Sequence, residues 1–367
     1  MPVIDADGHV EEDGAQLVDA LDPELRPLAP TTRREADGKV TILVEGRPWR
    51  PKYAFPRGAQ THTAAGGEYR AGGRDPRVRL EVLDSEGIDA AVLYPSMGFL
   101  FGLYEDATVA AALCAAYDDW LAAYCAADPS RLIGMALLPQ QDPALAVTEL
   151  ERAVTRHGFA GGVMRPNRIA GRTVDDDAFE PLWDAAGALD VPIVLHEAYT
   201  GSGIHTLGAD RVRSYTGGHV LSHPFEQMTA MLALTLAGVF ERHPALRLGF
   251  FEAGCSWAPY WVERIEEHYE LSPDDFAGGD PDGVLPRRAW LTFEVDERAM
   301  PATADLGWAD RICFASDYPH YDAVFPGAVK TVRERGLPPD LEAKLLGDNA
   351  LAFYGDRLVR LMAGGRQ

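Results

Sequence analysis

The chain has 367 residues, with 34 Lys and Arg against 56 Asp and Glu, and a formal net charge of −22. This excess of carboxylates argues against nucleic acid or an anionic membrane surface as a partner. We find no run of 18 apolar residues and no basic leader, and none of the four Cys forms a CxxC pair, so the sequence predicts a cytoplasmic protein with reduced thiols, no transmembrane span and no signal peptide.

The first predicted element is a strand over residues 3–10, within the opening stretch MPVIDADGHVEED. Side chains two positions apart share one face of a strand, so Asp5, Asp7 and His9 are expected on the same side. Two carboxylates and an imidazole are costly to bury unless a cation satisfies them. The stretch therefore indicates either a divalent metal site or an exposed acidic N-terminus.

Residues 11–76 interrupt the pattern that the rest of the chain follows. Within them, residues 39–50 predict a β-hairpin with Glu45-Gly46 as its turn, and residues 54–76 are rich in Gly and small polar residues, which predicts a long loop. Loops that follow barrel strands build the active-site face, so this insertion is a candidate lid or partner contact.

Eight short apolar runs, rich in Val, Ile, Leu and Phe, predict strands buried on both faces. They cover residues 3–10, 89–96, 131–139, 159–166, 191–198, 246–253, 289–295 and 311–318. Helical patterns such as 107–127 and 142–158 lie between them, the latter ending in Gly158 as a C-cap, and a second long loop is expected over 199–222. This alternation predicts an α/β fold, a (β/α)8 TIM barrel forming a single domain over 1–367 with the insertion 11–76. A Rossmann-like sheet is the alternative, but no GxGxxG follows an early strand.

Ionisable residues gather where the predicted strands end, which is where barrel enzymes place their chemistry. They are Asp7, His9, Glu12, Arg165, His196, Glu197, Glu252, Asp317 and His320, and His223 stands at the predicted head of the helix before the sixth strand. Borderline divalent metals favour this mixture of imidazole and carboxylate. The sequence therefore predicts a metal centre at the barrel mouth.

Five segments carry a resemblance to a known family. They are IDADGHVEE, AFEPLWDAAGALDVPIVLHEA, the stretch from HPFEQ to WVERIEE, CFASDYPHYD and LGDNALAFYG. The chain resembles the amidohydrolase superfamily and, within it, the amidohydrolase 2 family, which includes non-oxidative decarboxylases. The resemblance implies a metal-dependent TIM barrel and a homodimer. It also implies that the metal ligands are Asp7, His9, His196 and Asp317.

Three positions depart from the family pattern. The first strand carries Asp-x-His rather than His-x-His, and Arg165 stands where two-metal hydrolytic members have a bridging carboxylated Lys. Glu252 stands where the decarboxylases have a His that works as acid or base. Glu252 and His223 are therefore either a displaced acid–base pair or ligands of a second metal that Glu12 or His320 completes. The alternatives are an ion pair from Glu252 to Arg165 or Arg264, a backbone bond for His223, and a loop-shaping role for His320.

Two enzymatic functions fit this residue set. The leading expectation is a dinuclear non-haem Fe or Fe/Mn monooxygenase that uses O2 to hydroxylate a small to medium organic acid or its ester, because that gives His223 and Glu252 a joint role. A few family members that are similar in carrying this Glu are hydroxylases. The alternative is a mononuclear Zn- or Mn-dependent non-oxidative decarboxylase or hydrolase. A barrel retained for a structural role is disfavoured by the intact ligand residues.

The substrate side of the predicted site is defined by fewer residues. Arg165 could clamp a carboxylate, while Trp257 and Tyr94 could wall an apolar pocket or simply pack against the barrel. The predicted roles are catalytic for Glu252, His223 and Arg165, substrate-binding for Arg165, Trp257 and Tyr94, and metal-binding for Asp7, His9, Glu12, His196, His223, Glu252, Asp317 and His320.

Overall fold

A ring of parallel strands forms the centre of the molecule. The computed structural model describes residues 1–12, 14–34, 40–49, 67–198 and 203–364. The central strands are β1 (Ile4–His9), β5 (Ala90–Tyr94), β6 (Leu132–Gly134), β7 (Ala136–Leu137), β8 (Gly162–Met164), β9 (Ile193–His196), β10 (Leu248–Phe251), β11 (Ala289–Phe293) and β12 (Ile312–Phe314). Each of the eight predicted apolar runs contains one of these strands, with β6 and β7 forming a single run broken at Met135. These strands are buried along their whole length, as expected for strands covered on both faces.

The strands are hydrogen-bonded in the order β1-β5-β6 and β7-β8-β9-β10-β11-β12, all parallel. Two backbone bonds join β1 to the segment after β12: Asp317 N donates to Asp7 O at 3.0 Å, and His9 N donates to Tyr318 O at 2.7 Å. These bonds bring the first and last strands side by side, as in the predicted (β/α)8 barrel. The expectation of a single domain over 1–367 stays a prediction.

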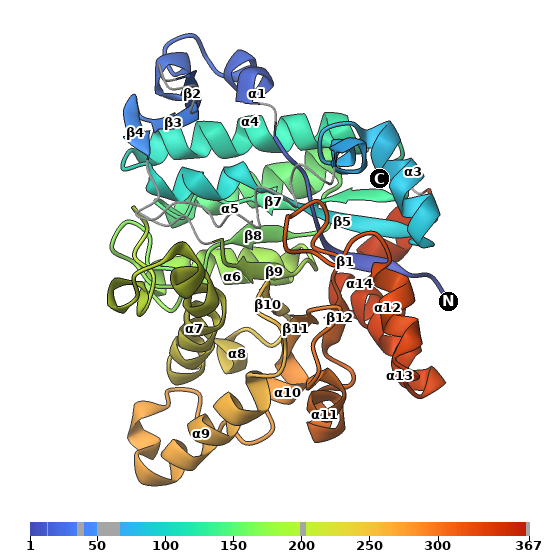
Figure 1. The fold of residues 1–367 in the computed structure, drawn as a ribbon. Coiled ribbons are helices and arrows are strands. Elements are labelled where there is room, and N and C mark those ends of the chain that lie inside the picture. Colours follow the sequence, from blue (N-terminus) through green and yellow to red (C-terminus); the bar gives the residue numbers. More distant parts are fainter. Residues whose placement is uncertain (13, 35–39, 50–66, 199–202, 365–367) are drawn as a thin grey trace.

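Helices surround the strands (Figure 1). They are α1 (Gly14–Ala20), α3 (Pro76–Glu86), α4 (Ala107–Cys125), α5 (Pro143–Arg152), α6 (Glu180–Ala188), α7 (Tyr215–Leu236), α8 (Val239–Arg242), α9 (Ala258–Leu271), α10 (Leu285–Arg288), α11 (Met300–Thr303), α12 (Ala328–Glu334), α13 (Pro339–Ala343) and α14 (Asn349–Met362). Several begin at an Asp whose side chain accepts a backbone N–H, as Asp142 does from Ala144 at 2.9 Å. A turn of π-helix continues α5 to His157, and Gly158 ends it with φ 75°, as predicted.

The insertion after β1 carries a small antiparallel sheet of its own, drawn beside α1 and α4 in Figure 1. The predicted hairpin is confirmed as β3 (Val40–Val44) and β4 (Arg47–Trp49), with Glu45 and Gly46 both at positive φ in the turn. A further strand, β2 (Thr31–Arg34), pairs with β3. Much of the predicted loop over 54–76 lies outside the described residues, and residues 67–73 form a 3-10 helix.

The predicted loop over 199–222 is wrong for its second half, where α7 begins at Tyr215. The Ser214 side chain accepts the Gly217 N–H at 3.0 Å and caps the helix. Buried residues then recur every three or four positions along α7, so packing against the barrel outweighs its Gly and Pro residues. As a result His223 lies in the third turn of the helix rather than at its head.

All four cysteines are free and buried, as the sequence predicts. Among the described residues, we find no helix with the length and apolar character needed to cross a bilayer.

Candidate metal centre

Six ionisable side chains converge at the carboxyl ends of β1, β9, β10 and β12. Three are sealed from solvent and three reach it. The Asp7, His9 and His196 side chains are 1%, 0% and 1% exposed, whereas those of Glu252, Asp317 and His320 are 17%, 16% and 26% exposed. We refer to the first three as the inner set and to the second three as the outer set. The outer set therefore marks the side of the site that is open to solvent.

The inner set and Glu252 surround one point. His196 Nε2 lies 3.2 Å from Asp7 Oδ1 and 3.5 Å from Glu252 Oε2, and His9 Nε2 lies 3.6 and 3.7 Å from the same two oxygens. Donors about 2.1 Å from a tetrahedral ion would lie about 3.4 Å apart. The observed spacings match that separation, so these four residues fit a divalent cation.

A second group of donor atoms overlaps the first. His9 and Glu252 belong to both groups, and Asp317 and His320 complete the second. Asp317 Oδ1 lies 3.5 Å from His9 Nε2 and 2.5 Å from His320 Nδ1, and His320 Nδ1 lies 3.9 Å from Glu252 Oε1. All six side chains therefore share one continuous site.

Buried polar atoms without hydrogen-bond partners test whether this site fits a cation. Asp7 Oδ2 and His9 Nε2 are buried and make no hydrogen bond. An unpaired buried carboxylate oxygen costs about 1–3 kcal/mol or more, so such atoms are rare unless a further group satisfies them. The two side chains meet in the same space, with His9 Nε2 3.6 Å from Asp7 Oδ1, as a metal-binding site requires.

Backbone acceptors fix the orientation of both inner imidazoles. His9 Nδ1 lies 2.9 Å from Pro95 O, and His196 Nδ1 lies 2.9 Å from Glu197 O. A carbonyl can only accept, so each ring carries its proton on Nδ1 and directs the Nε2 lone pair into the cluster. This is the tautomer that a metal-binding histidine needs.

The local backbone turns two carboxylates back toward the centre. Glu252 and Asp317 have φ of 62° and 52°, a left-handed conformation that is rare for residues other than Gly. Each follows directly or closely after a strand, β10 or β12. Such strain costs on the order of 1–2 kcal/mol per residue and commonly marks functional positions.

Burial and neighbouring charges shift the pKa values of the cluster. Burial, then the neighbouring Asp317 and Asp7, raise the pKa of Glu252 well above its usual value. Burial and nearby carboxylates likewise raise the pKa of Asp317, and burial with the His320 and His196 rings lowers the pKa of His9. A bound cation would favour the carboxylates and the neutral imidazoles together.

Arg165 forms an ion pair with Glu197 rather than with Glu252. Its Nη2 lies 3.2 Å from both Glu197 carboxylate oxygens, and its Nε donates to Asn167 Oδ1 at 2.8 Å. The guanidinium is buried and contacts neither Glu252 nor open solvent. The sequence placed Arg165 correctly at the end of β8, but the predicted substrate clamp does not follow from this geometry.

Glu12 and His223 lie outside both groups. The Glu12 carboxylate accepts the backbone N–H groups of Ser96, Met97 and Gly98 at 2.8–2.9 Å, at the start of the 3-10 helix Met97–Leu103. His223 Nδ1 lies 2.9 Å from Ser222 Oγ and 3.2 Å from His219 O, so its ring is held by its own helix. The structure therefore does not bring these two predicted ligands to the centre.

Of the two predicted pocket aromatics, Tyr94 contacts the metal centre and Trp257 packs against the core. Tyr94 is fully buried, its ring stacks on His196 with centroids 5.4 Å apart, and its hydroxyl meets that of Tyr354 at 2.6 Å. Trp257 is half-buried against the core, and its Nε1 donates to Gly254 O at 2.9 Å.

Sequence reasoning missed several supporting residues. Ser96 Oγ lies 3.0 Å from His320 Nε2 and fixes that ring.

Asp5 does not join the cluster, although it was expected on the same face of the strand as Asp7. It accepts hydrogen bonds from Ser316 N and Oγ at 2.9 and 2.5 Å and lies 3.7 Å from Arg79. A register shift in β1 between Asp5 and Gly8 explains the difference, and nothing in the alternating pattern signals it.

Comparison with known proteins identifies relatives along most of the chain. A family model described as Amidohydrolase matches residues 4–355. The 2-amino-3-carboxymuconate-6-semialdehyde decarboxylase of Dictyostelium discoideum is 27% identical over 288 residues, 77% of each chain. A gamma-resorcylate decarboxylase of Polaromonas sp. strain JS666 is 33% identical over 261 residues, 67% of this chain and 77% of that one.

Solved structures share the fold at lower identity. An amidohydrolase of Mycobacterium avium subsp. paratuberculosis K-10 superposes with a TM-score of 0.81 at 22% identity, covering 96% of this chain and 99% of that one. A dihydroxybenzoic acid decarboxylase of Polaromonas sp. JS666, described with bound manganese and 2-nitroresorcinol, gives 0.69 at 22% identity, covering 97% and 99%. These likenesses support the predicted α/β barrel fold.

The comparisons correct the leading functional expectation and confirm the family. The predicted monooxygenase is wrong, because the named relatives are decarboxylases, which favour the non-oxidative alternative. Nothing in them supports iron or an Fe/Mn pair, and manganese is the metal described in three similar structures. The prediction failed because an added His and a Glu at the sixth strand were interpreted as ligands of a second ion, whereas His223 bonds to its own helix. The chain belongs to the amidohydrolase family and is an enzyme of that family.

Proposed function

We propose that this protein is a divalent-metal-dependent, non-oxidative decarboxylase of a small organic acid whose carboxylate sits on an unsaturated carbon. The observation that carries the proposal is the convergence of buried, unpaired Asp7 Oδ2 and His9 Nε2 on one space at the strand ends. The decarboxylase relatives, which include proteins named for resorcylate and carboxymuconate semialdehyde, supply the reaction class and the substrate class.

The proposed roles divide between the two sets. Asp7, His9 and His196 hold the ion, which we propose is of the manganese or zinc type and which, when bound, polarises a substrate oxygen. Asp317 and His320 complete the site on the exposed side.

Glu252 is the proposed proton donor. In a non-oxidative decarboxylation the bond between carbon and the carboxylate breaks, CO2 leaves, and the same carbon takes a proton. Glu252 occupies the sixth-strand position, contacts the cluster, and is 17% exposed on the substrate side. A carboxyl group there can deliver the proton that the product needs.

The test begins with metal analysis of the purified chain and a panel of hydroxybenzoates, including 2,6-dihydroxybenzoate. We expect about one Mn or Zn per chain, release of CO2 with and without O2, and one solvent deuterium in the product made in D2O. Chelation should abolish turnover and manganese should restore it.

Two variants separate the proposed roles. His196→Ala should lose both metal and activity. Glu252→Gln should keep its metal, because the amide oxygen can replace the carboxylate oxygen among the four donors, and should lower kcat at least about 100-fold, because the amide has no acid proton.

Specific outcomes would contradict the proposal. Turnover that consumes O2, or hydrolysis of an ester panel without release of CO2, would replace the reaction class. Full metal occupancy in His196→Ala would remove the ligand assignment. Two tightly bound ions per chain would show that both overlapping groups are occupied.

A further inference from the structure

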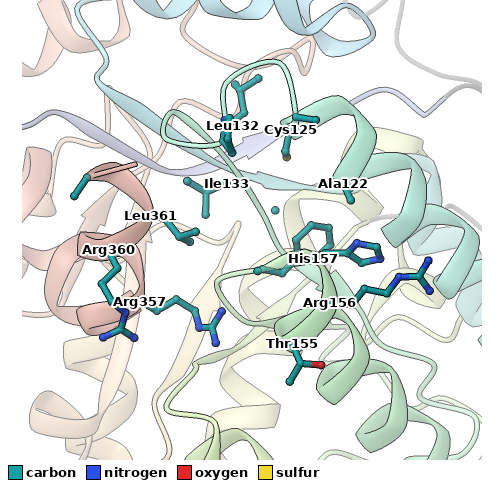
Figure 2. Close-up of a pocket in the computed structure, with 16 residues that line it drawn as sticks. Ala122, Cys125, Leu132, Ile133, Thr155, Arg156, His157, Arg357, Arg360 and Leu361 are labelled. Carbon is teal, nitrogen blue, oxygen red and sulfur yellow. The ribbon is translucent and has the colours of Figure 1, made fainter. Parts of the chain in front are cut away.

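A cavity lies at the opposite end of the barrel from the metal centre. Its volume is about 610 Å³, and it opens beside the first residues of β6 and the segment leading into β8 (Figure 2). Its walls come from the end of α4, from β6, from the π-helical turn that ends at His157, and from α14. Cavities of about 300–1,000 Å³ are the usual size for small-molecule sites.

The cavity combines an apolar floor with a cationic rim. Cys125, Ile133, Phe159 and Leu361 line the floor. Arg156 lines it from the π-helical turn, and Arg357 and Arg360 line it from α14; in Figure 2 the Arg156 side chain points away from the two α14 arginines. None of the described residues that line the cavity is acidic, in a chain whose net charge is −22.

Arg357 is the polar group that this arrangement leaves unsatisfied. It is 7% exposed, its Nη1 donates to Val154 O at 3.2 Å, and its Nε is buried without a hydrogen-bond partner. Burial, then the nearby charge of Arg360, lower its pKa. A buried guanidinium with an open donor and a like charge beside it is stabilised by an anion.

His157, the other basic residue that lines the cavity, is already paired with a carboxylate. His157 Nε2 lies 2.7 Å from Asp119 Oδ1, which also meets Arg152. The cationic character available to a ligand therefore belongs to the arginines.

We propose that this cavity binds an organic carboxylate with an apolar body. The guanidinium groups of Arg357 and Arg360 would hold the carboxylate, and the apolar floor would take the hydrocarbon part. The proposal is independent of the reaction at the metal centre, because no residue of the inner or outer set lines the cavity.

Benzoate binding to the full chain, measured by calorimetry, tests the proposal. All variants are made in the His196→Ala chain, which removes the metal that could itself hold a benzoate carboxylate. Arg360→Gln is the first test variant, since its side chain is exposed and its loss should not disturb folding, and Arg357→Gln is the second, since it removes the buried guanidinium. Arg333→Gln on α12 is the matched control, because it is an exposed arginine outside the cavity.

We expect the His196→Ala chain and its Arg333→Gln variant to bind benzoate alike, and the Arg360→Gln and Arg357→Gln variants to bind at least tenfold more weakly. Benzamide and inorganic phosphate should each bind at least tenfold more weakly than benzoate, since one lacks the charge and the other the apolar body. Unchanged affinity in both test variants, no binding by the His196→Ala chain, or equal binding of benzamide or phosphate would overturn the proposal.

Discussion

At the scale of single residues, Glu12 is a buried carboxylate whose partners are three backbone N–H groups. It closes the first turn of the 3-10 helix Met97–Leu103, next to Pro95, whose carbonyl orients His9. Its negative charge is thus used to shape the loop that supports the metal centre.

We expect Glu12→Gln to lower the free energy of unfolding by about 1–3 kcal/mol, because an amide can satisfy fewer of the three N–H donors. Denaturant unfolding measures the loss. Metal content should stay at the wild-type level, in contrast to His196→Ala. A Glu12→Gln protein that is fully stable but depleted of metal would show that Glu12 is a ligand after all.

Tyr94 and Tyr354 give a second prediction at this scale. The Tyr354 hydroxyl donates to Ala6 O at 2.8 Å, so the Tyr94 hydroxyl donates to Tyr354. Tyr354→Phe therefore leaves a buried donor and a buried carbonyl unpaired and should cost about 1–3 kcal/mol, whereas Tyr94→Phe removes only a donor and should cost about 0.5–1.5 kcal/mol. Unfolding of the two variants under identical conditions tests the ranking, and equal or reversed costs would contradict the hydrogen-bond directions.

At the scale of elements, an ion pair joins α6 to the end of α8. Glu180 bonds with Arg242 and lies 2.7 Å from His243 Nε2. The bond with Arg242, assisted by His243, lowers the pKa of Glu180 below its usual value. A lowered carboxyl pKa contributes stability above the unfolded-state pKa, and that contribution is lost as the pH falls through the folded-state value.

Glu180→Gln should therefore lower the unfolding free energy at pH 7 by about 0.2–1 kcal/mol, the range for partly exposed pairs. The difference from wild type should shrink as the pH falls through the lowered folded-state pKa of Glu180, because the carboxylate of the wild type is then protonated too. Thermal unfolding across pH measures this, with the exposed Glu263→Gln as control. A difference that grows toward low pH would contradict the assignment.

At the scale of the whole molecule, the metal centre joins strands from both ends of the chain. Asp7 and His9 come from β1 and Asp317 follows β12, so a bound ion would clamp the first and last strands together. Binding to the folded state alone stabilises by about 2.7 kcal/mol at a free metal concentration of 100 times Kd.

We expect chelated protein to unfold at a temperature several degrees below the metal-loaded protein, and the difference to vanish in His196→Ala. Scanning calorimetry at fixed protein concentration measures both. A chelator-insensitive Tm would show that no ion bridges these strands. The expected homodimer stays a prediction, which light scattering in solution can test.

Much of the barrel could be predicted from the sequence because its information is local. Each of the eight apolar runs contains a strand, and the helices between them follow from a 3.6-residue repeat and from caps such as Asp142 and Gly158. The loop predicted over 199–222 is wrong from Tyr215 onward, because burial of one face of α7 makes this segment helical despite its Gly residues.

The sequence by itself determined the family, the strand order along the chain, and the placement of ionisable residues at the ends of the strands. Only the tertiary structure decided which of them meet. Asp5 and Asp7 share a spacing yet face different partners because β1 shifts register, and Arg165 is held by Glu197 because β8 and β9 are adjacent. The alternation along a strand determines which side chains share a face. Which residue each side chain meets across the barrel depends on strand register and on loops such as the one that Glu12 closes. Register and loop conformation are set by contacts between residues far apart in the chain.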